Sequence, residues 1–271
     1  MTSIRLILLS LLLSSMAYSQ GSLDGFYQGK GNLVTVVGFG FEDTKNYFAG
    51  TTRTDFGRNL YSFSAFASYG ILEDLDMQVS IPFLISNKQS DFQDMQIGVK
   101  YRLLRTSFTR GNFELSAGGG FSFNLTDYRL GGLNDLGQQA KIIDTRLIAH
   151  YTRDSGWFGT LNSGFSFKLA ETPNSFPLVL KIGRATAKLY FDFWYDLQHS
   201  FGGIDYLGTP RPQNFREFGV SYHKIGGTVY IPFTPASGIF FAPSYLVAGR
   251  NAFQGPSYHL GWVYRIPKKD L

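Results

Sequence analysis

The sequence of 271 residues contains no cysteine. This absence excludes a disulfide framework, a thiolate metal site, a cysteine nucleophile and a lipid anchor on an N-terminal cysteine. Charged residues are also scarce, at 17% of the chain, and the net charge of +5 is spread along the sequence rather than gathered in basic clusters. We therefore expect no nucleic-acid partner.

Long apolar runs are missing as well. After residue 20, no stretch of the sequence approaches the ~20 consecutive apolar residues that a membrane-spanning helix needs. The chain is instead rich in aromatic residues, at 17%, and in glycine, with 31 residues. This combination is typical of long amphipathic β-strands, and the triplet Gly118–Gly120 is interpreted as relief for strand curvature.

The N-terminus has the layout of a secretory signal peptide. A basic residue precedes an apolar run from Leu6 to Leu13, and Ala17 and Ser19 occupy the −3 and −1 positions of a cleavage site. A membrane anchor is the alternative interpretation, but the run is well short of ~20 residues. We expect cleavage after Ser19, which divides the chain into a signal peptide over residues 1–19 and one domain over residues 20–271.

Apolar and polar residues alternate with period two through most of the remaining chain. Between Leu75 and Phe83 the odd positions are apolar, and Asp76, Gln78 and Ser80 oppose them. Strict alternation predicts a β-strand with two unlike faces. The same pattern predicts strands at residues 60–69, 94–103, 113–125, 143–151, 157–169, 178–182, 187–197, 218–222, 229–233, 239–247 and 258–266. No segment after residue 20 shows a convincing helical period, so we expect an all-β protein with almost no helix.

The polar faces of these strands carry too many charges for a dry core. In a soluble β-sandwich the apolar faces would meet in a shared core, whereas in an outer-membrane barrel they would face lipid and the polar faces would face the lumen. The exported N-terminus, strands of about ten residues and aromatic residues near strand ends favour the barrel. The charged residues expected to line its lumen are Lys100, Arg102, Glu114, Asp144, Arg146, Lys168, Lys181, Lys188, Asp192 and Asp196.

The lipid-facing residues follow from the same register. A shift by one residue would bring several lysines and arginines to the lipid, at a cost of about 2–4 kcal/mol each near mid-bilayer. We therefore expect these side chains to point out of the barrel: Tyr101, Phe121, Phe123, Leu147, Phe165, Phe191, Phe193, Tyr245 and Trp262.

Connections between the predicted strands alternate between short and long, as in outer-membrane barrels with short periplasmic turns and long external loops. A first count of the sequence gives thirteen strands, but single-chain bacterial barrels have an even number. We resolve this conflict by joining residues 215–233 into one strand, in which a β-bulge at Gly226–Gly227 shifts the apolar phase from even to odd positions. The prediction for residues 20–271 is one outer-membrane β-barrel domain, a single antiparallel transmembrane β-barrel of about twelve strands, with ten or fourteen as alternatives.

Two neighbouring segments carry a family resemblance. Residues 69–83, YGILEDLDMQVSIPF, form a predicted strand, turn and strand with a proline near the end, and residues 94–103, DMQIGVKYRL, follow as another strand. Together they resemble the outer-membrane family of phenol-degradation meta-pathway proteins, in which such a hairpin precedes a D-x-x-x-G-x-K-Y-R strand. The resemblance implies a porin-like barrel or channel and a link to aromatic compounds.

No residue pattern points to catalysis. The four histidines lie far apart, and His150, Ser155 and Asn162, which lie near one turn, lack the compact spacing of a nucleophile and its base. We expect no enzyme activity, no cofactor and no metal.

The predicted function is a passive channel in the outer membrane for small solutes, hydrophobic or aromatic ones included. A barrel of twelve strands would have a narrower lumen than the wide porins of 16–18 strands. The alternative is a non-conducting barrel that serves as a structural or interaction subunit of an envelope or secretion complex. The expected partners are outer-membrane lipid and small solutes, and the oligomeric state stays open.

Overall fold

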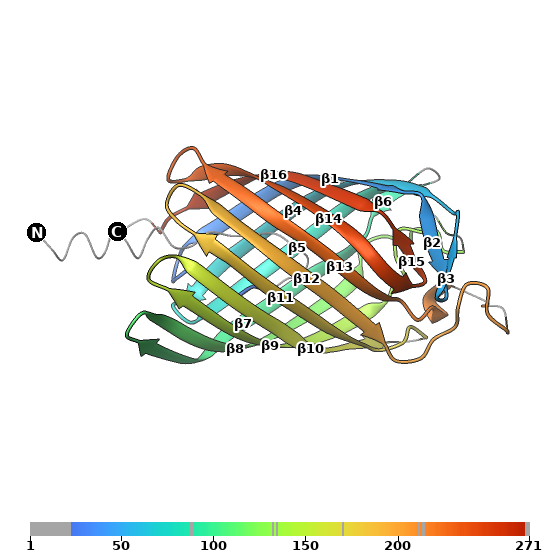
Figure 1. The fold of residues 1–271 in the computed structure, drawn as a ribbon, viewed down its shortest axis with the longest axis horizontal. Helices are drawn as coiled ribbons and strands as arrows, with labels where there is room; N and C mark the ends of the chain where they lie inside the picture. Colours follow the sequence, from blue (N-terminus) through green and yellow to red (C-terminus); the bar gives the residue numbers. More distant parts are fainter. Residues whose placement is uncertain are drawn as a thin grey trace, which may run out of the picture.

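The structure is a computed structural model that describes residues 23–86, 89–131, 133, 135–169, 171–210, 212 and 215–268. The predicted signal peptide, residues 1–19, lies outside the described residues. Twelve antiparallel strands close into one barrel (Figure 1). These strands are β1 (Leu33–Thr44), β4 (Arg58–Leu72), β5 (Leu75–Ser86), β7 (Asp94–Phe108), β8 (Gly111–Asn124), β9 (Lys141–Arg153), β10 (Trp157–Leu169), β11 (Ser175–Ala185), β12 (Tyr190–Ser200), β13 (Ser221–Pro232), β14 (Ser237–Arg250) and β16 (Pro256–Ile266).

Neighbours in the sequence pair with one another around most of the barrel, and the ring closes where β1 pairs with both β4 and β16. Alternation along each strand turns successive side chains inward and outward. A closed ring leaves no barrel strand with an unpaired edge, which membrane-spanning strands require because lipid offers no hydrogen-bond partner. The predicted strand number and the antiparallel topology are confirmed.

The two ends of the barrel differ. Tight turns join β4 to β5, β7 to β8, β9 to β10, β11 to β12 and β13 to β14 at one end, which corresponds to the periplasmic side of outer-membrane barrels. We call it the short-turn end. The opposite, long-loop end carries a small sheet of β2 (Asn46–Ala49), β3 (Thr52–Thr54) and β15 (Ala252–Gln254), at the right of Figure 1.

Two further short elements belong to the long-loop end. The strand β6 (Ser90–Phe92) pairs with β5, and a 3₁₀ turn, η1, spans Phe215–Glu217. No helix among the described residues is long and apolar enough to cross a membrane.

The strand β13 is a single strand, as predicted, but the reason proposed for it is wrong. Its registers with β12 and β14 run across Gly226–Gly227 without a shift, so there is no bulge at these glycines. The register shifts between His223 and Lys224, where β14 contributes the extra residue. The apolar phase of β13 is constant, because Tyr222 faces the lumen with its hydroxyl 3.5 Å from Asp196 Oδ2, and the earlier apolar positions precede the strand.

The outer face of the barrel is apolar around its circumference. Phe193 is 67% exposed, Trp262 57% and Leu147 53%. Monomeric soluble proteins rarely expose contiguous apolar patches above a few hundred Å², so this face meets lipid. Six members of the predicted outward set are exposed, which confirms the predicted register: Tyr101, Phe121, Leu147, Phe193, Tyr245 and Trp262. The other three are partly covered by outward-facing aromatic neighbours: Phe123 by Phe121, Phe165 by Phe167 and Phe191 by Trp157.

The interior of the barrel has a mixed lining. An apolar cluster from β10, β11, β12, β13, β14, β16 and β1 includes Tyr190, Tyr230, Phe240 and Val263. Buried charged residues lie on β5, β7 and β9 and also on strands of this cluster: Asp76, Lys100, Asp144, Lys181, Asp192, Asp196 and Lys224.

Candidate functional site

The N-terminal segment, residues 23–32, precedes β1 and enters the lumen at the short-turn end. Side chains of its first six residues are enclosed by the barrel: Leu23 is 2% exposed, Gln28 5% and Phe26 9%. Gly29 and Gly31, with φ angles of 76° and 85°, form the turn through which the segment leads into β1. The sequence analysis assigned this segment to the barrel domain without a structure of its own, so its position inside the lumen is a new finding.

Lys100 is the central contact of the N-terminal segment. Its side chain is fully buried, and its Nζ donates to the carbonyl oxygens of Asp24, at 2.9 Å, and of Phe26. The same Nζ lies 3.5 Å from Asp24 Oδ1 and 3.9 Å from Asp76 Oδ2. Asp76 Oδ2 in turn accepts a hydrogen bond from the backbone N–H of Gln28 at 3.1 Å. The barrel wall thus binds the main chain of the segment at three successive places.

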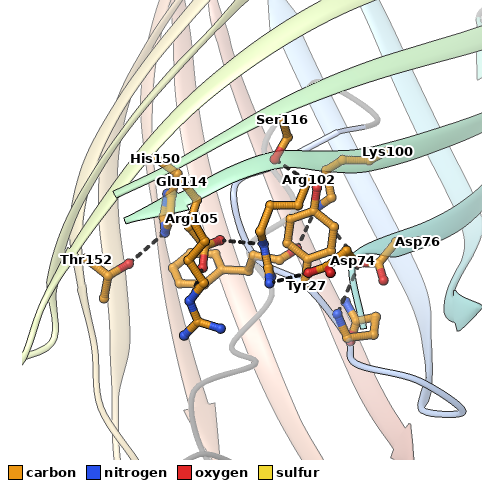
Figure 2. A network of polar contacts seen from close by, with 12 residues as sticks. Tyr27, Asp74, Asp76, Lys100, Arg102, Arg105, Glu114, Ser116, His150 and Thr152 are labelled. Atoms are coloured by element: carbon orange, nitrogen blue, oxygen red, sulfur yellow. Dashed lines mark hydrogen bonds and ion pairs between the residues drawn. The ribbon is translucent and has the colours of Figure 1, made fainter. Parts of the chain in front are cut away.

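Tyr27 connects the segment to a row of charges at the short-turn end (Figure 2). Its hydroxyl donates to Ser116 Oγ at 2.8 Å, and the cationic groups of Lys100 and Arg102 lie 4.2 and 4.1 Å from its ring centroid. Arg102 also pairs with Asp74 at 2.7 Å and with Glu114 at 3.3 Å. Cation–π contacts are strongest where the cation is shielded from water, as it is here.

The apolar side chains of the segment fit complementary surfaces of the wall. The Phe26 ring packs edge-on against His150 and Phe158, with centroids 4.6 and 5.0 Å away. Leu23 lies over Gly118, where a Cβ would come within 2.4 Å of Leu23 Cδ1. Gly118 therefore makes room for Leu23, a role beyond the curvature relief inferred from the sequence. The segment fills this part of the lumen with a packed interface.

His150 and Asn162, weighed in the sequence as members of a hydrolytic site, have other partners. The two ring nitrogens of His150 lie 2.7 Å from Thr160 Oγ1 and 2.8 Å from Thr152 Oγ1. Asn162 Nδ2 donates to the carbonyl oxygen of Leu23 at 2.6 Å. Ser155 lies in the exposed turn between β9 and β10. The three residues therefore contact the segment, the threonines and solvent rather than one another.

The remaining predicted lumen charges lie on inward faces along the barrel. Asp144 pairs with Arg146 at 2.9 Å and accepts from Ser166, and Lys181 pairs with Asp192 at 3.5 Å. Asp196 lies near the Tyr222 hydroxyl. Including Lys168, nine of the ten predicted residues face inward: Lys100, Arg102, Glu114, Asp144, Arg146, Lys168, Lys181, Asp192 and Asp196.

Lys188 does not face the lumen, and its prediction is wrong. The predicted strand began at residue 187, but β12 begins at Tyr190, and Lys188 is exposed in the preceding turn. Thr186 closes this turn, because its N–H donates to the Leu189 carbonyl at 3.0 Å and its hydroxyl does so at 2.8 Å.

The sequence analysis missed several lumen residues. Asp76 and Lys224 occupy polar-face positions of β5 and β13, so the period-two alternation could have identified them. Asp24 and Phe26 have no such signal, because they belong to an irregular segment.

A cavity of about 410 Å³ lies at the long-loop end. It is lined by aromatic side chains such as Tyr47 and Phe253 and by charged ones such as Glu42 and Arg58. The Arg58 guanidinium lies 4.2 Å from the Phe253 ring centroid and 3.5 Å from Glu42 Oε2. Burial raises the pKa of Tyr47 well above its usual value, so its hydroxyl stays protonated. The cavity therefore offers an aromatic surface beside fixed charges.

Loops fold over this cavity and are held by two amide side chains. Asn251 Oδ1 accepts from the backbone N–H of Gly50 at 2.9 Å and of Tyr206 at 3.0 Å. Gln138 Nε2 donates to the carbonyl oxygens of Phe215 and Phe218, both at 3.1 Å. These contacts join loops that lie far apart in the sequence into one cap.

Solved structures with a similar fold include outer-membrane channels and porins. An outer membrane channel from Pseudomonas putida F1 shares 14% identity over 92% of this chain and 100% of its own, with a TM-score of 0.73. The NanC porin shares 11% identity over 86% of this chain and 100% of its own, with a TM-score of 0.54. The KdgM porin shares 8% identity over 84% of this chain and 98% of its own, with a TM-score of 0.50. None of the curated proteins searched matches the chain.

A family model described as "Putative MetA-pathway of phenol degradation" matches residues 24–258. This range runs from the N-terminal segment to β16 and therefore includes nearly the whole barrel. The resemblance drawn from residues 69–103 is thus confirmed over most of the chain, and the chain belongs to this family.

Proposed function

We propose that the protein is a passive channel of the Gram-negative outer membrane for small solutes that combine an aromatic or apolar part with a polar group. The chain is exported by a signal peptide that is cleaved after Ser19. The solute enters the cavity at the long-loop end and leaves at the short-turn end.

The mixed lining of the interior is the observation that carries this proposal. A lumen with charges all round would favour ions and sugars, and a wholly apolar one would exclude water. Here the apolar cluster around Phe240 and Tyr230 shares the interior with charged residues such as Asp144 and Arg146. Selectivity in pores follows from the groups that line them, so this lining favours amphipathic solutes. The family's link to phenol degradation agrees with an aromatic solute.

The N-terminal segment is the constriction in this proposal. It occupies the lumen at the short-turn end through Phe26, Tyr27 and Leu23, and the bonds to Lys100 hold it there. Passage of anything larger than water or a small ion then requires the segment to shift.

Conductance and solute flux test the proposal. The mature protein is compared with a variant that lacks residues 20–27, in planar bilayers and in liposomes loaded with benzoate or with arabinose. We expect low conductance for the intact protein, several-fold higher conductance for the variant, and faster flux of benzoate than of arabinose. Absence of conductance and of flux in both proteins would overturn the channel. Equal conductance in the two would remove the segment as its constriction.

The packed N-terminal segment and the folded cap also favour a second function, a non-conducting barrel that acts as an interaction subunit of an envelope complex. Binding residues concentrate on loops held by a rigid scaffold, and the cap around Asn251 and Gln138 is such a surface. A stable partner that copurifies with the protein, together with no conductance in either protein above, would select this function.

A further inference from the structure

A shallow groove interrupts the lipid-facing surface of β9, β10 and β11 near the short-turn end. Its volume is about 640 Å³. Aromatic and aliphatic side chains form its walls: Phe113, Tyr151, Leu161, Leu180, Ile182 and Phe193.

Small residues form the floor of this groove. Gly159 of β10 pairs with Tyr151 on one side and with Ile182 on the other, so its missing side chain leaves a gap between two large ones. Ala149 lies next along the floor, paired with Leu161. A Cβ at Gly159 would meet the Lys181 carbonyl oxygen at 3.9 Å, an ordinary contact. The backbone therefore does not require glycine here, and the gap is free for another occupant.

Two arginines stand at the periplasmic mouth of the groove. Arg184 of β11 pairs with Trp157, which lies two residues before Gly159, and Arg153 of β9 lies two residues after Tyr151. Both arginines are exposed, and Arg184 Nε donates to the Ser155 carbonyl oxygen at 3.2 Å. Strands lie about 4.8 Å apart in a sheet, so the two Cα atoms on either side of β10 are about 10 Å apart. Two arginine side chains can span that distance to reach one phosphate.

The surrounding turns keep this mouth cationic. Asp154, in the turn after β9, directly follows Arg153 in the sequence and is exposed. Its N–H donates to the Arg110 carbonyl oxygen at 3.2 Å. Arg110 and Lys188, in the adjacent turns, are exposed as well. Four exposed basic residues thus accompany one exposed acidic residue in these turns and strand ends.

We propose that this surface binds one anionic glycerophospholipid of the periplasmic leaflet. Its phosphate accepts charge-assisted hydrogen bonds from Arg153 and Arg184, in the fork geometry that suits a guanidinium. One acyl chain lies in the groove over Gly159 and Ala149. Trp157, 42% exposed, lies at the level where chain and headgroup meet, as tryptophan does at membrane interfaces.

The test is native mass spectrometry of the mature barrel in detergent with added phosphatidylglycerol or phosphatidylethanolamine of the same acyl composition. Two variants test the two parts of the site. The double variant Arg153→Gln with Arg184→Gln removes the phosphate-binding cations, and Gly159→Leu fills the groove for the acyl chain. Lys141→Gln is the control for charge, because Lys141 is an exposed, lipid-facing base at the long-loop end of β9. Gly119→Leu is the control for shape, because a Cβ at this outward-facing glycine would meet the Asp144 carbonyl oxygen at 3.7 Å.

We expect the native barrel to retain one phosphatidylglycerol in preference to phosphatidylethanolamine. The affinity should fall about thirtyfold in the double arginine variant, since each of the two basic residues contributes about 1 kcal/mol near a membrane surface. Gly159→Leu should lower it as well, while both controls retain the lipid. Equal retention of the two lipids by the native barrel would overturn the proposal, as would equal loss in a variant and its control. If one of the two variants does not fold, the other variant and its control still test the proposal.

Discussion

The Leu23 side chain occupies the space that a side chain on Gly118 would need, because a Cβ on Gly118 would stand 2.4 Å from Leu23 Cδ1. Gly118→Val should therefore displace Leu23 and weaken the binding of the N-terminal segment. We expect higher single-channel conductance and faster hydrogen exchange over residues 23–28. Gly119→Val is the matched control, because Gly119 faces outward and a Cβ there meets the Asp144 carbonyl oxygen at an ordinary 3.7 Å. If both variants behave alike, the contact with Leu23 has no effect on the channel.

Lys100 supplies hydrogen-bond donors and a positive charge to several buried acceptors, so its replacement should destabilise the barrel. Lys100→Met keeps the length of the side chain and removes its charge, which leaves Asp76 and the carbonyl of Phe26 without this partner. Breaking a buried ion pair costs about 3–5 kcal/mol, and we expect that loss in urea unfolding of the refolded barrel. The exposed Lys188→Met should change the free energy of unfolding by less than about 0.5 kcal/mol. Similar midpoints for the two variants would show that the Lys100 contacts add no net stability.

The outward register predicts which substitutions impair membrane insertion. Phe193 is 67% exposed on the lipid-facing side of β12, and Phe193→Arg would bring a charge to lipid, at a cost of up to about 2–4 kcal/mol. We expect a lower folding yield into lipid vesicles, measured by heat-modifiable migration on a gel. Lys188→Ala, in the exposed turn, should fold like the native protein. Equal yields would contradict the lipid-facing assignment of β12.

Alkaline pH should loosen the long-loop end through Tyr128. Burial raises the pKa of the Tyr128 hydroxyl, which donates to Asp94 Oδ1 at 2.9 Å and accepts from the Gln139 N–H at 2.8 Å. Because the folded pKa lies above the unfolded value of about 10, the protonated hydroxyl stabilises the loop fully below pH ~10 and less as the pH rises further. Proteolysis of residues 125–140 should therefore accelerate above that pH.

Tyr128→Phe removes the titrating group and provides the control for this prediction. The variant should be cleaved faster at neutral pH, because Asp94 and the Gln139 N–H lose a partner, and its cleavage should depend less on alkaline pH. A pH dependence identical to that of the native protein would assign the effect to another group.

The strands of the barrel wall could be predicted because every second residue faces lipid and must be apolar. A shift of one position in β7 or β9 would expose Lys100 or Arg146 to lipid, so the alternation defines both the strands and their faces. The same reasoning failed at Lys188, because the alternation of apolar and polar residues continues through the short turn before β12. The sequence pattern therefore does not distinguish this turn from a strand. It also failed at Tyr222, where an aromatic residue on the inward face resembled a change of phase.

The N-terminal segment could not be predicted, because no local pattern specifies its position. Phe26 and Lys100 lie 74 positions apart, and Asn162 contacts the segment across 139 positions. The segment is neither helix nor strand, so its place depends on the completed wall around it. The lipid groove was missed for a related reason, since Gly159 and Ala149 become neighbours of Ile182 and Leu180 only through the registers of β9, β10 and β11.

The pairing of β1 with β16 has a consequence for how the protein is made. The two strands pair from Leu33 with Ile266 to Glu42 with Ser257, so the seam that completes the ring joins the first barrel strand to the last. The seam therefore forms after nearly the whole chain has been synthesised and delivered. Because the N-terminal segment continues directly into β1, it is tethered beside this seam at the moment of closure. A newly closed barrel thus has the segment beside the lumen in which it binds Lys100 and Asn162.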